Sequence, residues 1–569
     1  MSANENRSDL FRSFDALWQA RLARATLGIS PASVTSALGT WALHMWQAPG
    51  KMMELATYPS FHTQEYWRCL FGSDAHPQNG EGPDPRFKSE SWNQWPWRAY
   101  RYGFHMAEEW LSLATQDVPG LDERSQRIVS FGARQLMDAL CPANFPMTNP
   151  ELAGETIAKK GENLVRGARN FLHDIHHMLM GLPADDGMHF QVGRNLAVTP
   201  GQVVYRNELM ELIQYSPQTP TVHQEPILIV PAWIMKYYIL DLSPANSLVR
   251  WLVERGHTVF MISWKNPDRE DAHLTMDDYQ NLGIMTALDV VSKTCGKNKI
   301  HLAGYCLGGT LAMIAAATMA LKGDKRLKSL TLLAAQGDFS DAGELMLFIT
   351  PSQVSFLQNI MKAQGYLDTK QMAGAFQMLR SYDLIWSKII NDYLHGMRRG
   401  TVDFMAWNAD TTRMPCDMHS AYLERLFLNN EFAEGHYTVE GKAVAAENIH
   451  VPVFAVGTDR DHVAPWESVY KIHLMVNGDV TFILAKGGHN VGIVSEPGHA
   501  GRFFLEKERG SGDPYIDPQT WRDTATRQPG SWWLAWDRWL EANGTPEKAP
   551  PPPPLDNLGA APGTYVLHR

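Results

Sequence analysis

We predict an α/β fold built on a mainly parallel sheet, with a mostly helical domain before it. Residues 191–569 contain six short apolar runs rich in β-branched residues, separated by helical stretches, which is typical of a parallel sheet covered on both faces. Residues 1–190 show helical periodicity and little strand-like patterning. The length of 569 residues also exceeds what one hydrophobic core usually supports, so more than one domain is expected.

The composition is that of an ordinary globular protein. Hydrophobic residues make up 44% and charged residues 20%, and the net charge of -10 gives no reason to expect nucleic acid as a partner. The five cysteines are odd in number and show no CxxC pair, so we expect neither a disulfide framework nor a zinc site. The first residues lack the pattern of a secretory signal, and a reducing cytoplasm fits best.

One uncharged stretch, Leu302 to Leu321, is long enough to pass as a membrane helix. Three glycines and a Tyr-Cys pair interrupt its first half, which suits a strand, a tight turn and a buried helix better. We therefore expect no transmembrane segment.

Near the N-terminus, one face of a predicted helix is apolar. This face either docks on the rest of the protein, which we favour, or adsorbs to a lipid or polymer surface. Its residues are Leu10, Phe14, Leu17, Trp18 and Leu22.

The six apolar runs are the predicted strands of the sheet. In chain order they are "PILIVPAW" from Pro226, "HTVFMISW" from His257, "KIHLAGY" from Lys299, "LKSLTLLAA" from Leu327, "VPVFAVGT" from Val451 and "VTFILAKGG" from Val480. Between the fourth and fifth runs, residues 338–448 are too long for a structureless connection, so we predict a helical insertion that caps the active-site side of the sheet. "APPPPPLD" from Ala549 predicts an extended spacer or surface strap.

The third run leads into the motif Gly-Tyr-Cys-Leu-Gly, and an apolar helix is predicted after it. A strand, a glycine-flanked turn and a helix form an elbow that presents its central residue, here Cys306, as a nucleophile. Gly304 and Gly308 provide the space that this turn needs between strand and helix. The dipole of the following helix favours a thiolate at its N-terminus.

The other two members of a catalytic triad follow in the order that an α/β-hydrolase fold requires. Asp461 lies just after the fifth run, and His489 lies in "KGGHNVG" just after the sixth. We prefer Asp461 to its neighbour Asp459 because of the Asp-x-Val-x-Pro context, and we assign His462 a structural role. The sequence therefore predicts Cys306 as nucleophile, His489 as base and Asp461 as the acid that orients it.

Two places supply candidate oxyanion donors through their backbone N–H groups. One is Leu307, directly after the nucleophile, and the other is Trp233 or Ile234, at the end of the first run. The chain contains no glycine-rich phosphate cradle of Walker or dinucleotide type, and the histidines of "HDIHH" at His173 are interpreted as a helix face. We expect no bound cofactor and no metal.

Beyond these residues, a series of motifs resembles the polyhydroxyalkanoate synthases, most closely the class I, single-subunit type. The motifs, which cover nearly the whole chain, are "DPRFKSESW", "CPANFPMTNPE", "GENLVRGARNFL", "MKYYILDLSPANSLVRWLVERGHTVFMISWKNP", "GYCLGG", "DFSD", "GYLDTKQMAGAFQMLRSYDLIW", "WNADTTRMPCDMHSAYL", "DRDHVAPWESVY" and "GSWWLAWDRWLEANG". Carried over by position, the family's catalytic cysteine, aspartate and histidine fall on Cys306, Asp461 and His489. One departure is Met235, where the family usually has an asparagine.

The resemblance implies an acyltransferase that polymerises (R)-3-hydroxyacyl-CoA, with 3-hydroxybutyryl-CoA as the expected substrate, and releases CoA through a Cys306 thioester. It also implies a cytoplasmic homodimer at the surface of polyester granules, with residues 1–190 serving dimerisation and granule association. Two alternatives stay open. The same triad can deliver water, as in a thiol-dependent depolymerase or thioesterase, and an inactive paralogue can coat granules as a structural protein.

Overall fold

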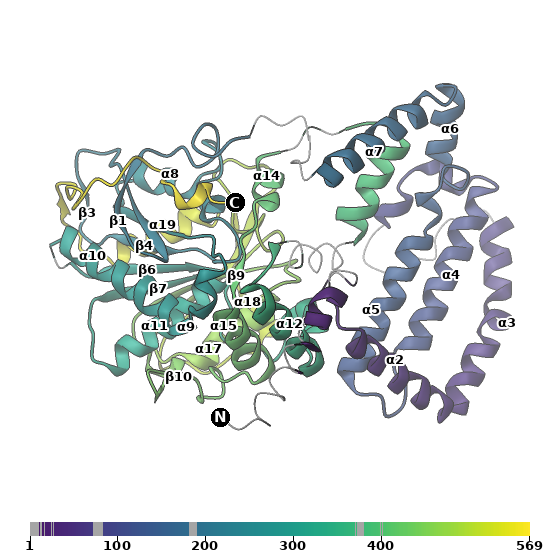
Figure 1. Cartoon of the computed structure of the whole chain (residues 1–569), viewed down its shortest axis with the longest axis horizontal. Coiled ribbons are helices and arrows are strands. Elements are labelled where there is room, and N and C mark those ends of the chain that lie inside the picture. The colour runs from purple at the N-terminus through teal and green to yellow at the C-terminus, as the bar shows by residue number, and fades with distance from the viewer. Residues whose placement is uncertain are drawn as a thin grey trace. The chain divides into compact units, whose positions relative to one another are not determined.

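The computed structural model of the chain describes residues 11, 14–15, 17–23, 26, 28–71, 84–180, 190–296, 298–369, 371, 381–398, 400 and 402–569. These residues form two compact units (Figure 1). The sheet unit comprises the described residues of 1–25, 189–372 and 402–569, and the helical unit those of 26–188 and 373–401.

The two units differ in two places from the domains expected at residues 1–190 and 191–569. The described residues before position 26 belong to the sheet unit, and residues 381–398 of the expected cap belong to the helical unit. Ala23 packs against Phe356 and Ile360, with Leu22 beside them. Of the apolar N-terminal face, Phe14, Leu17 and Trp18 are more than half exposed, and Leu10 lies outside the described residues.

The described residues of the helical unit form six helices and five short helical turns. The helices are α2 (Pro31–Trp46), α3 (Pro49–Phe71), α4 (Trp97–Thr115), α5 (Glu123–Leu140), α6 (Pro150–Ala158) and α7 (Glu162–Met180), and the turns are η1 (Pro85–Phe87), η2 (Glu90–Asn93), η3 (Pro142–Asn144), η8 (Tyr382–Trp386) and η9 (Ile389–Leu394). Polar side chains set several of the starts: Ser30, Asp122 and Asn149 each accept a hydrogen bond from a first-turn amide. Proline follows Ser30 and Asn149 at the first helical position, where it needs no N–H donor.

The sheet unit contains a ten-stranded sheet in the order β1-β2-β5-β4-β6-β7-β12-β13-β14-β15. The bounds are β1 (Gly201–Arg206), β2 (Met210–Tyr215), β4 (Ile227–Val230), β5 (Val259–Trp264), β6 (Ile300–Tyr305), β7 (Leu327–Leu333), β12 (Val453–Thr458), β13 (Val480–Ala485), β14 (Phe503–Arg509) and β15 (Thr526–Pro529). The six central strands are parallel to one another, and they correspond to the six predicted runs. Two antiparallel strands at each edge were not predicted.

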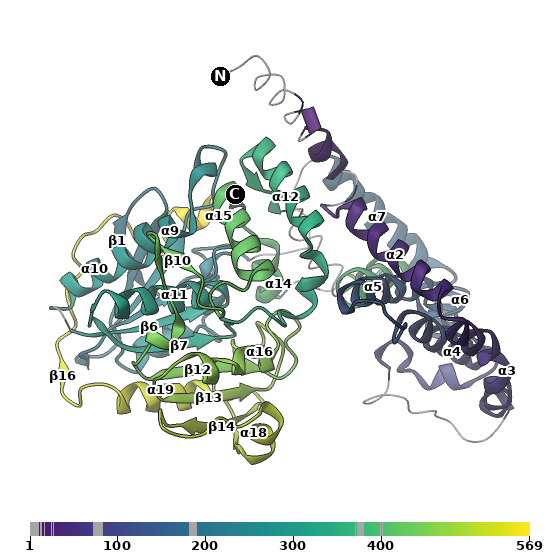
Figure 2. The ribbon, with the colours of Figure 1, turned by 90° about the horizontal axis from the view of Figure 1, so that it is seen from below.

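Side chains of the central strands alternate between two hydrophobic cores, one on each face of the sheet. In β4, Ile227 and Ile229 join one core, whereas Leu228 and Val230 join the other. Helices α8 (Leu248–Glu254) and α19 (Trp533–Ala542) cover the first face, and α10 (Thr286–Thr294) and α11 (Leu307–Leu321) cover the second (Figure 2). The sheet is therefore buried on both sides, as parallel sheets require.

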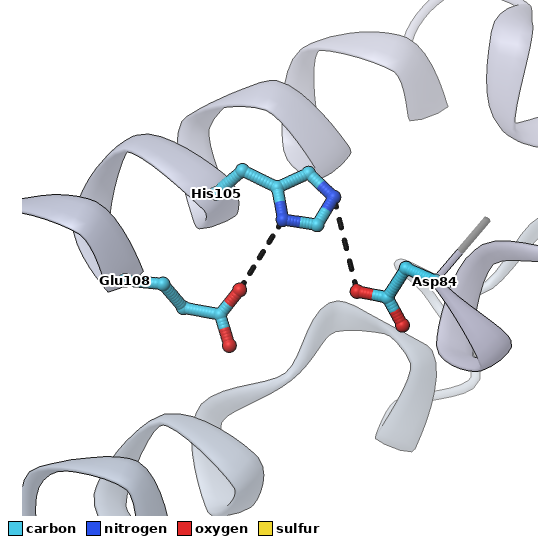
Figure 3. A group of neighbouring side chains, drawn as sticks. All are labelled: Asp84, His105 and Glu108. Carbon is cyan, nitrogen blue, oxygen red and sulfur yellow. Dashed lines mark hydrogen bonds and ion pairs between the residues drawn. The ribbon is translucent and has the colours of Figure 1, made fainter. Parts of the chain in front are cut away.

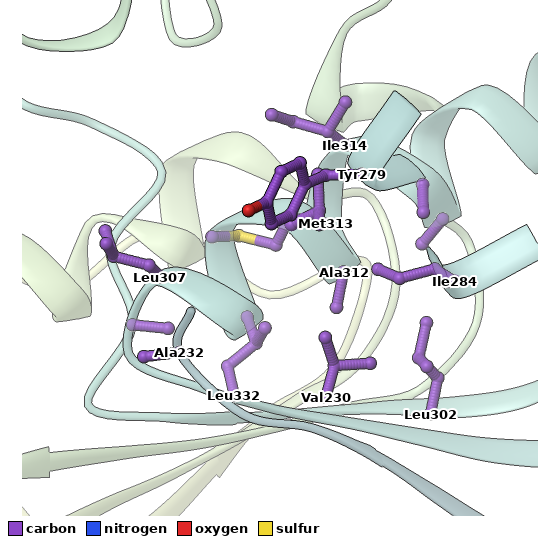
Figure 4. Close-up of a cluster of buried hydrophobic side chains, with 14 of the residues drawn as sticks. Val230, Ala232, Tyr279, Ile284, Leu302, Leu307, Ala312, Met313, Ile314 and Leu332 are labelled. Carbon is purple, nitrogen blue, oxygen red and sulfur yellow. The ribbon is translucent and has the colours of Figure 1, made fainter. Parts of the chain in front are cut away.

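Figure 4 shows how α11 packs on the sheet. Val230, Leu302 and Leu332 project from three neighbouring strands toward the helix, where Ala312 faces them and Ile314 lies on the far side beside Tyr279. Almost every side chain of α11 is buried, so the helix has no charged face. The uncharged stretch from Leu302 is thus a strand, a turn and a buried helix, and no helix in the described part of the chain is long and apolar enough to cross a membrane.

The remaining elements of the sheet unit connect or extend its strands. The helices and helical turns are η4 (Tyr237–Asp241), η5 (Glu270–His273), α9 (Met276–Asp278), η6 (Tyr279–Met285), η7 (Gly343–Phe348), α12 (Pro351–Gln364), α14 (Asp403–Ala409), α15 (Cys416–Ala421), η10 (Tyr422–Leu428), η11 (Ala446–Asn448), α16 (Trp466–Tyr470), α17 (Ile472–Met475), α18 (Pro518–Thr524) and η12 (Tyr565–Leu567). Short paired strands are β3 (Val222–His223) with β16 (Lys548–Ala549), β8 (Tyr366–Leu367) with β9 (Met414–Pro415), and β10 (Thr438–Val439) with β11 (Lys442–Ala443).

The strand order has a topological switch point at β4. The chain passes from β4 to β5 on one side and then crosses back to β6 on the other side. Loops that leave the carboxyl ends of two strands at such a switch point diverge, which creates the usual ligand site of an open parallel sheet. The two loops here are the ones that carry Trp233 and Cys306.

Candidate active site

Cys306 lies in a strained turn between β6 and α11. Its backbone has φ 51° and ψ -124°, a conformation that an L-residue adopts only when its surroundings impose it. The amide of Cys306 donates to the carbonyl oxygen of Leu333 at the end of β7, with an N···O distance of 2.9 Å. The side chain is partly exposed although its neighbours are buried. The turn therefore presents the thiol at the carboxyl edge of the sheet.

The glycines of the elbow are required by close backbone contacts. A Cβ at Gly304 would lie 2.3 Å from the Cα of Gly309, and a Cβ at Gly308 would lie 2.1 Å from the carbonyl oxygen of Val230. Real Cβ atoms essentially never come this close to backbone. The start of α11 is consequently pressed against the end of β4, which brings the two candidate oxyanion loops together.

Replacing Gly308 by alanine is expected to lower the free energy of unfolding by about 3 kcal/mol, because backbone must move to admit the new methyl group. Denaturant unfolding of the purified variant measures this loss. Gly132→Ala in α5 is the control: its Cβ meets nothing within 4 Å, and a helical alanine should raise stability by about 1 kcal/mol. An unchanged midpoint for Gly308→Ala would contradict the close approach of α11 to β4.

His489 and Asp461 form a buried hydrogen-bonded pair at the same edge of the sheet. His489 Nδ1 lies 2.8 Å from Asp461 Oδ2, and the Asp461 side chain is fully buried. Asp461 also accepts hydrogen bonds from the Thr458 hydroxyl at 3.0 Å and from the amides of Val463 and Ala464 at 2.9 Å. With both oxygens occupied in this way, the carboxylate holds the imidazole in one orientation.

The charges in this pair stabilise each other. Burial disfavours the ionised carboxyl of Asp461, but His489 and the hydrogen bonds outweigh burial and lower its pKa. Burial also opposes the imidazolium, yet Asp461 and then Cys306 raise the pKa of His489 well above its ordinary value. The influence of Cys306 on this pKa indicates that the thiol lies near the imidazole.

The neighbours of Asp461 have other roles. Asp459 accepts a hydrogen bond from the amide of Gly487, 2.7 Å away, and so fixes the loop that carries His489. The backbone oxygen of His462 accepts from the amide of Glu344. Asp459 therefore positions the loop while Asp461 contacts the imidazole.

The start of helix α19 is hydrogen-bonded to the segment that follows His489. The indole nitrogens of Trp532 and Trp533 donate to the carbonyl oxygens of Gly492 and Ile493, each at 2.9 Å. These hydrogen bonds link the start of α19 directly to the segment that carries His489.

The candidate oxyanion donors lie on two segments, the start of α11 and the loop after β4. Leu307 is the first residue of α11, where backbone amides lack an acceptor within the helix. On the loop after β4, the carbonyl oxygen of Ile234 accepts from the Thr412 amide, and that of Trp233 accepts from the Thr412 hydroxyl. Met235, at the family's asparagine position, forms a backbone bridge with Thr411. The loop after β4 is therefore held by segment 411–412.

Three further residues at the site were not predicted. The Tyr305 hydroxyl donates to Asn490 Oδ1, and its ring lies 5.8 Å from that of His489, centroid to centroid. Burial and then the charge of Cys306 raise the pKa of Tyr422 well above its usual value, which places Tyr422 near the thiol. Tyr305 precedes Cys306 and Asn490 follows His489 in the sequence, so their places beside the site could have been predicted. Tyr422 comes from the insertion, and nothing in its local sequence indicates that it lies near Cys306.

One cluster in the helical unit has residue types that could hold a metal. Asp84, His105 and Glu108 converge, and His105 Nδ1 lies 3.2 Å from Glu108 (Figure 3). Arg86 pairs with both carboxylates, at 2.7 Å from Asp84 and 2.6 Å from Glu108. A guanidinium already balances these charges, so the donor set fits an ion-pair cluster rather than a cation site. In the "HDIHH" segment, Asp174 likewise pairs with Arg398 and Tyr393.

Comparisons with known proteins agree with this architecture. A family model described as the poly-beta-hydroxybutyrate polymerase (PhaC) N-terminus matches residues 83–252, one described as poly-beta-hydroxybutyrate polymerase N terminal matches residues 9–51, and one of the alpha/beta hydrolase fold matches residues 225–496. The sheet unit is accordingly an alpha/beta hydrolase fold, as predicted from the elbow.

Relatives match along most of the chain. A poly(3-hydroxyalkanoate) polymerase of Methylorubrum extorquens is 40% identical over 490 residues, which cover 85% of this chain and 80% of that protein. A poly(3-hydroxyalkanoate) polymerase subunit of Rhizobium meliloti (strain 1021) is 37% identical over 501 residues, covering 87% and 81%. Among solved structures, a monoacylglycerol lipase of Paleococcus ferrophilus is 13% identical and covers 59% of this chain and 99% of its own, with a TM-score of 0.34.

Proposed function

Since the chain belongs to the poly(3-hydroxyalkanoate) polymerase family, we propose that it polymerises (R)-3-hydroxyacyl-CoA, with 3-hydroxybutyryl-CoA as the expected substrate, and releases CoA. The observation that carries this proposal is the position of Cys306, a thiol on a nucleophile elbow near the hydrogen-bonded pair of His489 and Asp461. Such a thiol can accept an acyl group as a covalent thioester.

In the first half of the proposed reaction, Cys306 attacks the thioester carbonyl of the substrate. His489 takes the thiol proton, Asp461 stabilises the imidazolium, and the sulfur forms a bond to the acyl carbon. The backbone amides of Leu307 and of Trp233 or Ile234 stabilise the oxyanion. The C–S bond to CoA then breaks, and CoA leaves with a proton from His489.

In the second half, the acyl group moves from Cys306 to a hydroxyl. His489, alone or with Asp461, removes the proton of the 3-hydroxyl of an acyl unit, whose oxygen attacks the thioester on Cys306. An ester bond forms and the thiol is regenerated. Exchange of a thioester of CoA for a thioester of cysteine is nearly isoenergetic, so the acyl group stays activated for this transfer. This explains a cysteine where hydrolases with this elbow usually have serine.

Replacing Asp461 by asparagine should lower the pKa of His489, because the carboxylate that stabilises the imidazolium is removed. The shift of the His489 ring carbon with pH, followed by NMR of histidine-labelled protein and assigned with His489→Gln, measures this change. In the native chain the resonance should titrate well above pH 6.5.

Asp459→Asn is the matched control, since Asp459 lies on the same loop but binds the Gly487 amide. It should leave the titration of His489 in place. A shift in this variant and none in Asp461→Asn would reverse the assignment of the two acids.

The proposed function also includes a granule-bound homodimer without a cofactor. The helical unit exposes large apolar side chains that suit contact with a polyester or a second copy. The most exposed are Trp46, Met53, Phe61, Phe71, Trp95, Met147, Ile157, Met178 and Leu179. Sedimentation of the native chain with amorphous polyester particles, and its mass in solution, test these two points.

The experiment that tests the function incubates the purified protein with (R)-3-hydroxybutyryl-CoA and assays free CoA and insoluble polyester in the same tube. Polymerisation predicts both products in step. CoA release with only free 3-hydroxybutyrate would establish the hydrolase instead. Binding to granules without any CoA release, from short or long acyl chains, would establish the structural paralogue.

A further inference from the structure

The last described residues of the chain lie against the active-site loop. Segment 558–561 pairs with the edge of β1: the Leu558 amide donates to Val203 and the Ala561 amide donates to Gly201, each at 2.9 Å. The turn η12 then follows, and Val566 is buried in the same core as Trp532 and Ile229. We call Leu558–His568 the tail segment.

Two buried ionisable side chains hold the backbone of the tail segment. Glu211, which is fully buried, accepts from the amides of Thr564 at 2.9 Å and Tyr565 at 3.0 Å, and from the Thr564 hydroxyl at 2.8 Å. The ammonium of Lys236, 3% exposed, donates to the carbonyl oxygens of His568 at 2.7 Å and Tyr565 at 3.3 Å. A carboxylate thus binds the amide end of η12 and an ammonium binds its carbonyl end, as the peptide dipoles favour.

Lys236 connects the tail segment to the reacting centre. It ends the loop after β4 that also carries Trp233 and Ile234, the candidate oxyanion donors. Its own carbonyl oxygen accepts from the Trp407 indole at 2.7 Å. Asn266 connects the tail segment to segment 407–413, because its side chain donates to the carbonyl oxygen of His568 and accepts from the Arg413 amide. The loop is therefore held between segment 407–413 and the tail segment.

We propose that the tail segment is a positioning element of the active site, which acts through Glu211 and Lys236 to hold the backbone amides of Trp233 and Ile234 toward Cys306. This inference rests on the proposed function only for the identity of the substrate. Neither Glu211 nor Lys236 touches the reacting atoms; both act through the loop. Their loss should weaken transition-state stabilisation more than substrate binding.

Lys236→Met and Glu211→Gln test this proposal, because each keeps the shape of the side chain. Lys236→Met removes the ammonium donor, and Glu211→Gln removes the negative charge and one of the two acceptor oxygens that bind the tail segment. Glu225→Gln is the matched control. Glu225 is also buried and binds Thr545 through its amide and hydroxyl, but it precedes β4 at the opposite end of the strand. Glu225 therefore holds the segment around Thr545 in place without contacting the loop after β4.

Two assays separate the inference from the proposed function. The burst of p-nitrophenolate from p-nitrophenyl acetate reports acylation of Cys306 without any polymerisation, and CoA release from 3-hydroxybutyryl-CoA reports the polymerase. The burst rate and the rate of CoA release are each divided by the amount of folded protein, which is measured by alkylation of Cys306 with iodoacetamide. Failure of CoA release in the native chain would contradict the function, while the burst would still test the tail segment.

We expect Lys236→Met and Glu211→Gln to slow the burst by about 10- to 100-fold, less than the roughly 100- to 1,000-fold loss from removing an oxyanion donor, because the donors are displaced and not removed; KM should change little. The double variant should be no slower than the slower single variant, because both act through one segment. Glu225→Gln should acylate at the native rate. Native burst rates in both tail variants, with only a lower unfolding midpoint, would overturn the proposal and leave the tail segment a structural strap.

Discussion

Cys306→Ala is expected to lose CoA release and polymer formation together, by about 10,000-fold or more, because the atom that forms the covalent bond is removed. The variant should fold normally, since alanine keeps the Cβ and the elbow is set by its glycines and by the Leu333 contact. Assays of CoA release and of polyester test the loss of activity, and the unfolding midpoint of the variant tests whether it folds normally.

Cys295→Ala is the matched control for this loss. Cys295 lies at the end of α10, and burial raises the pKa of its thiol to about 12, so it is not a nucleophile at neutral pH. It should release CoA at the native rate. CoA release by Cys306→Ala near that of the native chain would show that another group carries the acyl chain.

His489→Gln is expected to reduce CoA release by about 10,000-fold, because the same imidazole accepts the proton in both halves of the reaction. Glutamine can still hydrogen-bond Asp461 but cannot accept and return a proton. Rapid-mixing kinetics should show slow acylation as well as slow turnover.

The control for His489 is His499→Gln, on the same stretch of chain. His499 is exposed and pairs with Glu496 at 2.7 Å, outside the contacts of Asp461. Its replacement should leave both rates unchanged. If His489→Gln slowed turnover while acylation stayed fast, the base of the first step would have to be another residue.

The parts of this fold that could be predicted are those with a local signature. The central strands are buried on both faces, so each appears in the sequence as a continuous apolar run. Strands β14 and β15 at one edge carry exposed charges such as Glu508 and Arg527, so they show no continuous apolar run and were not predicted as strands. Likewise, residues 381–398 have a helical pattern, but a pattern does not state which unit the helix joins.

The same distinction applies to the site. Cys306, Asp461 and His489 each follow a strand and carry their own motif, so sequence reasoning could name them. Tyr422 and the hold of Lys236 on His568 depend on residues far apart in the chain that meet only after folding. No local pattern in the sequence encodes buried contacts of this kind.

The most direct measurement is the mass of the Cys306 peptide during turnover. The native chain is mixed with (R)-3-hydroxybutyryl-CoA, quenched in acid while CoA is being released, and digested. We predict a Cys306 peptide that carries one or more 3-hydroxybutyryl units and loses them on treatment with hydroxylamine. An unmodified Cys306 peptide at that moment, with the acyl group on another residue or on none, would contradict covalent polymerisation at Cys306.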